Sequence, residues 1–339
     1  MLITKIYQPS EVAQAAKELT LGELIAFPTE TVYGLGADAT NEQAVKRVYL
    51  AKGRPSDNPL IVTVSSREMV KKYTGDLTAE AEKLMDTFWP GPLTLIFPII
   101  PDSLPKAVTG GLKTAAFRCP ASELTRTLIK EAGVPIVGPS ANSSGKPSPT
   151  TAQHVFHDLE GRIAGILDDG PTTVGVESTI LDLSSKQPTI LRPGAVSPEQ
   201  IAEVLGKAVI SDKHKVGQNE VPKAPGMKYK HYAPNAQVLI VPQDLWSQAL
   251  SWAKKETASV GIMATADILA KAKDYPSALT YDLGSDVTTA SQHLFDGLRY
   301  FDDQADVKWI LAQAYPEEGL GAAYMNRLKK AAGNQFFTE

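Results

Sequence analysis

The feature that most constrains the fold is a polar stretch, 212–232, which divides the chain into two parts with separate strand and helix patterns. This stretch is rich in lysine and interrupted by glycine and proline, as is typical of a linker. Short apolar runs alternate with amphipathic helical patterns before it, and a second alternation begins at Val238. Such alternation predicts an α/β fold, with a largely parallel sheet in the second part. We therefore expect domains at 1–210 and 235–339, joined by a linker at 211–234.

Within the first part, Leu24–Asp38 combines an apolar run, a polar turn and two glycines. The run Leu24–Phe27 predicts a buried strand, and Pro28 ends it because proline has no N–H to donate to a neighbouring strand. A helical pattern opens at Asn41. A glycine-containing turn between strand and helix can bring backbone close to a small ligand, although an ordinary connection looks the same. The glycine spacing matches neither a Walker phosphate loop nor a dinucleotide-binding fingerprint.

Composition excludes several classes of protein. The 339 residues are 43% hydrophobic, and the net charge of -4 gives no global reason to expect nucleic-acid or membrane binding. A single cysteine excludes an internal disulfide framework, and five scattered histidines show no metal-ligand spacing. The first residues lack the order of a signal peptide, and no apolar run is long enough to span a bilayer. We expect a soluble cytoplasmic protein with no membrane association.

Charged residues in two loops are candidates for ligand binding. Lys52 and Arg54 flank a glycine close to Asn58, a set that suits a polyphosphate. A solvated pair of surface charges is the simpler alternative. Arg118 ends an apolar strand, where it needs either an ion-pair partner or a carboxylate ligand. Arg192 ends another strand and could bind phosphate or be an edge-strand charge.

Hydroxyl and amide side chains form a further group of candidates. Ser140 and Asn142 follow a strand with no histidine nearby, which favours ligand hydrogen bonding over nucleophilic catalysis. Cys119 has no visible base, so a small packed residue is the better interpretation. The segment Lys228–Tyr232 mixes aromatic and cationic side chains. Such a segment can stack on a base or cover a pocket, although an ordered spacer remains an alternative.

Seven motifs follow one another in a fixed order: Pro28–Leu35, Lys52–Pro55, Asn58–Leu60, Trp89–Thr94, Arg118–Pro120, Gly138–Asn142 and Arg192–Gly194. In this order they resemble the YrdC-like L-threonylcarbamoyladenylate synthases. The linker motif Ala224–Pro234 and the trailing domain resemble the long, two-domain, Sua-type form of that family. The resemblance implies a twisted, mostly open α/β sheet around a large cavity in the first domain. It implies a smaller, Rossmann-like α/β domain after the linker.

The resemblance also implies a nucleotidyltransferase that condenses L-threonine, bicarbonate and ATP into threonylcarbamoyl-AMP and pyrophosphate. Mg²⁺ would arrive on the ATP phosphates rather than in a cage of protein ligands. A downstream tRNA threonylcarbamoyl transferase complex would use the product to modify the adenosine beside certain anticodons. Direct contact with tRNA or double-stranded RNA is left open. The alternative function is a double-stranded RNA-binding, ribosome-maturation protein without catalysis.

Site residues are carried over from the family motif by motif. The residues implied for L-threonine are Thr31, Thr63, Arg118, Ser140 and Ser178. Those implied for ATP are Lys52, Arg54, Asn58, Thr114, Asn142, Thr150, Arg192 and Tyr232. Lys52 and Arg54 would also act in catalysis by neutralising phosphate charge. Because the product is a labile mixed anhydride, Lys228–Tyr232 would close over the site and exclude water.

Overall fold

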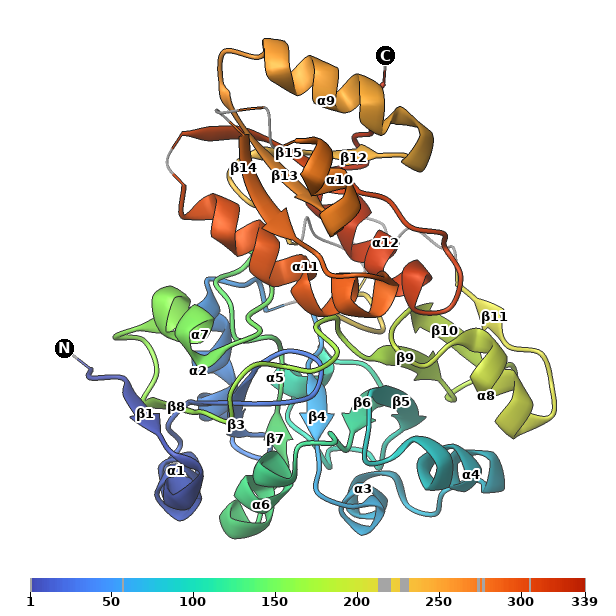
Figure 1. The fold of residues 1–339 in the computed structure, drawn as a ribbon. Helices are drawn as coiled ribbons and strands as arrows, with labels where there is room; N and C mark the ends of the chain where they lie inside the picture. The colour runs from blue at the N-terminus through green and yellow to red at the C-terminus, as the bar shows by residue number, and fades with distance from the viewer. Residues whose placement is uncertain are drawn as a thin grey trace. The chain divides into compact units, whose positions relative to one another are not determined.

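The computed structural model describes residues 2–56, 58–212, 221–225, 232–272, 275, 278–304 and 306–338 (Figure 1). The chain separates into two compact units, each of which is built from more than one segment. The first unit comprises Met1–Ser144, Pro149–Thr173 and Glu177–Tyr229. The second comprises Gly145–Ser148, Val174–Val176 and Lys230–Glu339. Two short segments from before the linker therefore belong to the second unit.

The first unit is built on one mixed sheet, whose strands run in the order β1-β8-β2-β3-β7-β4-β6-β5-β9-β10-β11. The strands are β1 (Lys5–Tyr7), β2 (Ile25–Phe27), β3 (Gly34–Asp38), β4 (Ile61–Thr63), β5 (Leu93–Pro98), β6 (Thr114–Arg118), β7 (Ile136–Val137), β8 (Gly165–Leu167), β9 (Thr179–Asp182), β10 (Thr189–Arg192) and β11 (Ile210–Ser211). Many neighbours are distant in the chain: β1 pairs in parallel with β8, and β5 pairs in parallel with β9. The predicted α/β class is confirmed, with a large sheet in this unit.

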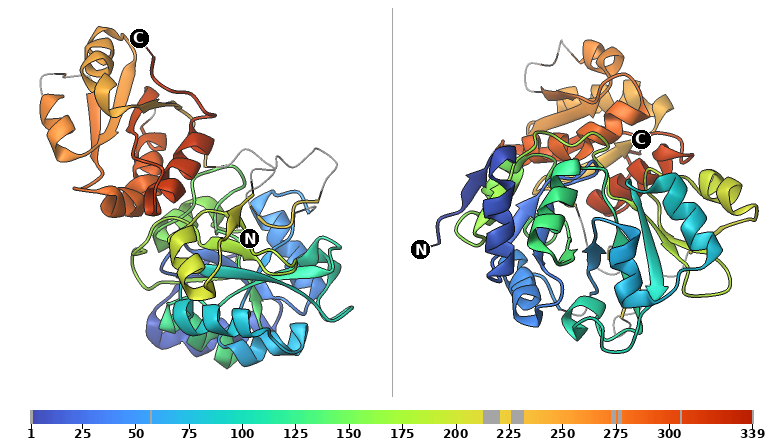
Figure 2. Two further views of the ribbon diagram at one scale, coloured as in Figure 1. Left: turned by 90° about the vertical axis from the view of Figure 1, so that its right-hand side faces the viewer. Right: turned by 90° about the horizontal axis from the view of Figure 1, so that it is seen from below.

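Helices cover the sheet of the first unit. They are α1 (Val12–Thr20), α2 (Glu42–Lys52), α3 (Arg67–Thr74), α4 (Ala79–Phe88), α5 (Lys106–Thr109), α6 (Glu123–Ala132), α7 (Ala152–Leu159) and α8 (Pro198–Leu205). Figures 1 and 2 show α1, α3, α4 and α6 along one side of the sheet. Apolar side chains from these helices and from the strands fill two clusters; one contains Val70 and Leu84, and the other contains Leu19 and Leu128.

The prediction of one strand followed directly by a glycine turn and a helix was wrong for Leu24–Asp38. The glycines lie at the start of a second strand, β3, which pairs antiparallel with β2. A Cβ on Gly34 would lie 2.5 Å from the ring of Phe27, and one on Gly36 would lie 2.7 Å from the carbonyl oxygen of Ile25. These glycines therefore allow close packing within the hairpin rather than the approach of a ligand.

Helix starts agree with the sequence. The side chain of Asn41 caps α2 by accepting from the backbone N–H groups of Gln43 and Ala44, at 3.1 and 3.2 Å. Ser197 caps α8 by accepting from the backbone of Gln200 at 3.3 Å. Each cap satisfies backbone N–H groups that the first turn leaves without partners. The cap on Asn41 fixes where α2 begins, and α2 in turn carries Lys52 at its last position.

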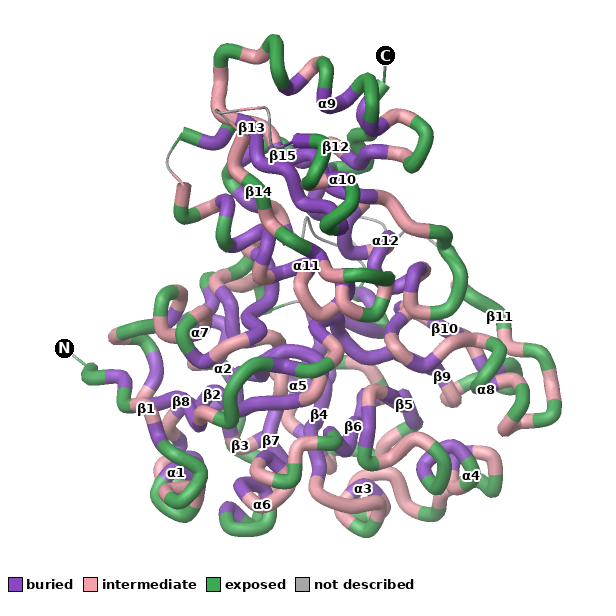
Figure 3. Tube along the Cα trace, viewed as in Figure 1, coloured by how far each residue is buried: buried purple, intermediate pink, exposed green. Residues whose placement is uncertain are grey.

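The second unit contains a smaller sheet in the order β12-β15-β13-β14, and its strand pairs are all parallel. Its strands are β12 (Gln237–Val241), β13 (Ser259–Ala264), β14 (Ala278–Asp282) and β15 (Val307–Gln313). Its helices are α9 (Trp246–Lys255), α10 (Ala266–Lys271), α11 (Val287–Asp302) and α12 (Leu320–Ala331). Figure 3 shows buried residues along β13 and β15, as expected for central strands covered on both faces. The predicted parallel α/β unit is confirmed.

In neither unit do the described residues include a helix long and apolar enough to cross a membrane.

Candidate functional site

Polar side chains gather on one face of the central strands of the first unit. Strand β4 pairs with β6 so that Thr63 lies opposite Arg118. Side chains alternate between the two faces of a strand, so Thr114 shares the face of Arg118, about 13 Å along the same strand. Ile96 of β5 lies opposite Ala116 of β6, so Thr94 and Arg118, each two positions away, share one face. Thr94 bonds to the hydroxyl of Ser178 on this face at 2.8 Å. We call this surface the polar face.

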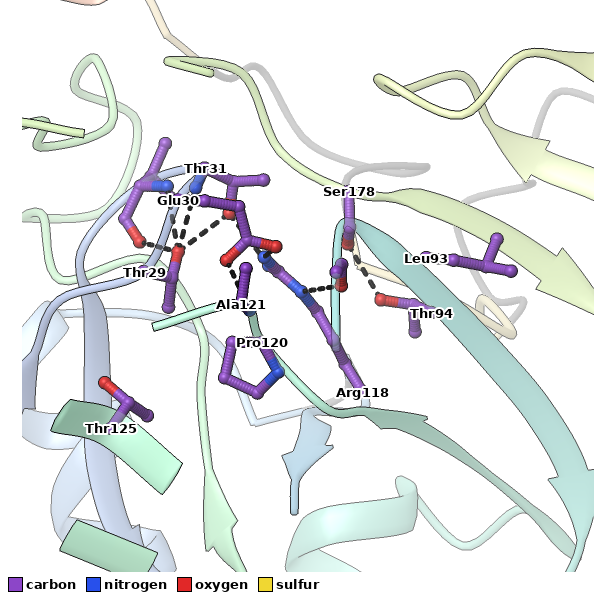
Figure 4. Close-up of polar contacts among 12 residues, drawn as sticks. Thr29, Glu30, Thr31, Leu93, Thr94, Arg118, Pro120, Ala121, Thr125 and Ser178 are labelled. Atoms are coloured by element: carbon purple, nitrogen blue, oxygen red, sulfur yellow. Dashed lines mark hydrogen bonds and ion pairs between the residues drawn. The ribbon is translucent and has the colours of Figure 1, made fainter. Parts of the chain in front are cut away.

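Arg118 of the polar face uses all three of its guanidinium nitrogens in hydrogen bonds. Its Nη1 donates to Thr31 Oγ1 at 2.8 Å, and its Nε donates to the carbonyl oxygen of Gly91 at 3.3 Å. Its Nη2 forms an ion pair with Glu30 Oε1 at 2.6 Å (Figure 4). Only 8% of Arg118 is exposed. The ion-pair interpretation of this residue therefore applies to the structure, and the role as carboxylate clamp stays a prediction.

Glu30 is a site residue that sequence reasoning missed. Its side chain is 10% exposed, and its second oxygen accepts the backbone N–H of Ala121 at 3.0 Å. Thr29 fixes the same turn: its hydroxyl bonds to that of Thr31 at 2.9 Å and donates to the carbonyl oxygen of Val32 at 2.6 Å. Glu30 lies within the first motif, but no pattern along the chain links it to Arg118, which is 88 positions away.

Ser178 and Arg192 form a second group on this face. Arg192 Nε donates to the backbone oxygen of Ser178 at 3.0 Å, and Nη2 donates to its hydroxyl at 3.1 Å. Thr94, which the sequence did not single out, bonds to the same hydroxyl at 2.8 Å. Strand β10 lies between β9 and β11, so the interpretation of Arg192 as an edge-strand charge was wrong. This group is linked to Arg118 through the backbone of two adjacent residues. The N–H of Thr179, next to Ser178, donates to the carbonyl oxygen of Pro92, and Arg118 donates to that of Gly91.

Lys52 forms hydrogen bonds with the loop that follows β7. Its ammonium donates to the backbone oxygens of Ser140 and Asn142, the latter at 2.5 Å. The hydroxyl of Ser140 in turn donates to Asn142 Oδ1 at 2.6 Å. Lys52 is 3% exposed, so it is not a solvated surface charge. The structure brings three predicted residues from two motifs into one group.

Arg54 lines a hollow beside α2. Gly53 ends α2 in the left-handed region, with φ of 61°, and the chain turns there. Arg54 then lines a hollow of about 780 Å³ between α2 and α5, together with Lys46 and Lys106. Lys52 therefore bonds to the loop after β7 and Arg54 lines this hollow, and their joint role at the ATP phosphates stays a prediction.

Asn58 is fully buried, and neither polar atom of its side chain has a hydrogen-bond partner in the described structure. Its backbone oxygen accepts from the hydroxyl of Tyr49 at 2.9 Å. An amide buried without partners is costly, because the hydrogen bonds lost with water are not replaced. Such a group is the kind of side chain that a bound ligand would satisfy.

Three further residues were predicted to bind ATP: Thr150, Thr114 and Tyr232. Thr150 is buried and lies 3.3 Å from the ring nitrogen Nδ1 of His154. Thr114 is half-buried at the far end of β6 from Arg118. Tyr232 belongs to the second unit, where its ring lies 5.0 Å from that of Phe295. The other lid residues, Lys228–His231, lie outside the described residues.

One described part of the linker, 221–225, packs on the polar face. Ala224 is fully buried in a cluster with Ile61 of β4, Ala116 of β6 and Ile180 of β9. Ile61 and Ala116 precede Thr63 and Arg118 by two positions, so they lie on the same face. Lys223 pairs with the buried Asp182 at 3.0 Å. This part of the linker is therefore anchored to the first unit.

Cys119 lies beside Arg118 but is buried, with 3% of it exposed. Burial raises the pKa of its thiol to about 11. A thiol in this state has little thiolate at neutral pH and is a poor nucleophile. The interpretation as a small packed residue agrees with the structure.

The described residues contain no group of three or more His, Cys, Asp or Glu side chains placed to hold a metal ion. Fold and site together define an α/β protein with buried cations and hydroxyls on one sheet face.

Comparison with known proteins names the family. A family model described as telomere recombination (Sua5_yciO_yrdC) matches residues 17–194, and a second, threonylcarbamoyl-AMP synthase C-terminal domain (Sua5_C), matches 196–333. The chain belongs to the Sua5/YciO/YrdC family, in its form with the additional C-terminal domain.

Relatives match both domains. The threonylcarbamoyl-AMP synthase of Bacillus subtilis is 48% identical over 330 residues, covering 96% of this chain and 94% of that protein. The synthase of Pyrococcus abyssi is 45% identical over 325 residues, covering 94% and 93%. The crystal structure of P. abyssi Sua5 complexed with L-threonine superposes with a TM-score of 0.89, at 42% identity and 99% coverage of both chains.

Proposed function

We propose that this protein is an L-threonylcarbamoyladenylate synthase. The substrates are L-threonine, bicarbonate and ATP, and the products are threonylcarbamoyl-AMP, pyrophosphate and water. The observation that carries the proposal is the buried guanidinium of Arg118, which donates to the hydroxyl of Thr31 and lies opposite Thr63 on the neighbouring strand. A guanidinium matches a carboxylate, and hydroxyls match the hydroxyl and ammonium groups of threonine. Ser140 and Ser178 complete the proposed amino-acid site.

The first chemical step in this proposal forms a carbamate. The amine of threonine, after losing a proton, attacks CO₂ or bicarbonate, and with bicarbonate a water molecule leaves. The step requires that the amino acid be held in one orientation more than it requires a protein nucleophile. Arg118 would bind the α-carboxylate, while Thr31 and Ser178 would orient the rest of the molecule.

In the second step a carbamate oxygen attacks the α-phosphorus of ATP, and the bond to pyrophosphate breaks. Negative charge moves onto the leaving group, so cations and amide donors near the phosphates lower the barrier. The proposed nucleotide residues are Lys52, Arg54, Asn58, Thr114, Asn142, Thr150, Arg192 and Tyr232. The unpartnered amide of Asn58 and the buried ammonium of Lys52 support this assignment. Mg²⁺ enters with the substrate as Mg-ATP, bound to phosphate oxygens.

Water must be kept from the product, because a carbamic–phosphoric anhydride hydrolyses readily. We propose that the linker 211–234 serves this purpose and separates a catalytic domain, 1–210, from a C-terminal domain, 235–339. The anchoring of Lys223 and Ala224 on the polar face supports the proposal. The product would pass to a tRNA threonylcarbamoyl transferase complex in the cytoplasm.

Pyrophosphate release tests the function. We expect release from ATP only when L-threonine and bicarbonate are both present, with omission of any one substrate reducing it to the background rate. Release that is independent of threonine would refute the proposal. A double-stranded RNA-binding protein would show no such release, and its RNA affinity would fall steeply as salt increases. No observation on the described residues favours that second function.

A further inference from the structure

The ion pair between Glu30 and Arg118 occupies the group to which we assign the substrate carboxylate. Glu30 Oε1 lies 2.6 Å from Arg118 Nη2, and both side chains are only 10% exposed. The guanidinium has five N–H donors. Three of them already bind Glu30, Thr31 and Gly91.

A second carboxylate at this guanidinium would place two anions on one buried cation. Carboxylates that share a buried site repel each other strongly, because little water is present to screen them. A substrate carboxylate therefore binds well only if Glu30 moves away from Arg118.

Glu30 has a second place to bind. Its Oε2 already accepts the backbone N–H of Ala121 at 3.0 Å, one residue before Ser122, which caps helix α6. The N-terminus of a helix stabilises a carboxylate. A cavity of about 250 Å³ lies beside it, lined by Glu30 together with Thr29, Ser122 and Thr172. This cavity can hold the carboxylate once it leaves the guanidinium.

We propose that Glu30 is an internal competitor that occupies Arg118 until the carboxylate of the amino acid displaces it. This inference rests on the proposed function and adds a residue that determines affinity and selectivity at the same site. In the empty site Glu30 neutralises a buried cation that would be costly to leave unpaired. It also keeps other anions off the guanidinium, including bicarbonate, which is itself a substrate.

The test replaces Glu30 with glutamine, which keeps the shape of the side chain and removes its charge. Glu123→Gln is the matched control, because Glu123 is an exposed carboxylate in the first turn of α6. L-threonine binding is measured by calorimetry in the absence of ATP, and KM and kcat are measured by pyrophosphate release.

For Glu30→Gln we expect threonine to bind at least fivefold more tightly and KM for threonine to fall by a similar factor. Bicarbonate should become a competitive inhibitor against threonine, whereas in the wild type and in Glu123→Gln it should act only as a substrate. A purely structural role for Glu30 would not produce this inhibition.

Threonine that binds the wild type but binds Glu30→Gln equally or more weakly would overturn this inference and leave the proposed function standing. Binding to neither protein would overturn both. If Glu30→Gln unfolds, Glu30→Asp provides the same comparison, because its shorter carboxylate reaches Arg118 less well and should also tighten threonine binding. Unchanged or weaker binding in that variant would likewise overturn the inference.

Discussion

Replacing Arg118 with methionine tests the proposed amino-acid site most specifically. The substitution removes the guanidinium but retains most of the buried apolar stem. A hydrogen bond to a charged group contributes about 1.5–3 kcal/mol, so KM for L-threonine should rise on the order of 10- to 100-fold. The KM for ATP should change much less, because the residues proposed for ATP occupy other groups.

The same substitution has a separate cost in stability. It leaves Glu30 as a buried carboxylate with no cation, and breaking a buried ion pair on one side costs roughly 3–5 kcal/mol. The double variant Arg118→Met/Glu30→Gln removes both charges and should recover much of the free energy of unfolding. Its KM for threonine should nevertheless stay high.

Two measurements are needed on each variant: the free energy of unfolding by denaturant titration, and KM for each substrate by pyrophosphate release. Comparing the single and double variants separates the loss of stability from the loss of substrate binding. Equal increases in the KM for threonine and for ATP would refute the assignment of Arg118. Normal use of threonine by the double variant would refute it as well.

Three further predictions concern the nucleotide site and the linker. Lys52→Ala should raise KM for ATP more than for threonine or abolish turnover, because Lys52 is a buried cation. Lys83→Ala, which removes an exposed lysine of α4, should leave both KM values and kcat unchanged. Equal effects of the two substitutions would contradict the assignment of Lys52. Asn58→Leu should keep or raise the free energy of unfolding by about 1–2 kcal/mol, because it removes a buried amide without partners, while KM for ATP rises. A lower free energy of unfolding with an unchanged KM for ATP would contradict the assignment of Asn58 to the nucleotide site. A chain ending near Leu205 should lose synthesis, and full activity would exclude a role for the linker.

The fold class could be predicted because apolar periodicity is a local property of the chain. The start of α2 at Asn41 could be predicted for the same reason, because the cap satisfies backbone groups only a few residues away. Strand order could not be predicted, since β1 finds its partner β8 about 160 residues later. The misinterpretation of Gly34 has the same origin, because the ring of Phe27 that requires a glycine there becomes a neighbour only when the hairpin forms.

The candidate site could also be predicted only in part, for the same reason. A charge on an apolar strand marked Arg118 as unusual, but the sequence could not say that Glu30 is its partner. The motif containing Lys52 and Arg54 marked both cations as candidates, but the sequence could not say that Lys52 bonds to the loop after β7. Residue types show which chemistry is available, whereas pairing between distant strands decides which groups meet.

The central claim is that the protein joins an amino acid, bicarbonate and a nucleotide into one product. The direct test incubates the protein with L-threonine, ATP and ¹³C-labelled bicarbonate and identifies the products by mass spectrometry. The account predicts threonylcarbamoyl-AMP carrying one ¹³C atom, formed in equal amount with pyrophosphate. Pyrophosphate accompanied by threonyl-AMP or AMP, with no ¹³C in any nucleotide product from the earliest time points, would contradict it.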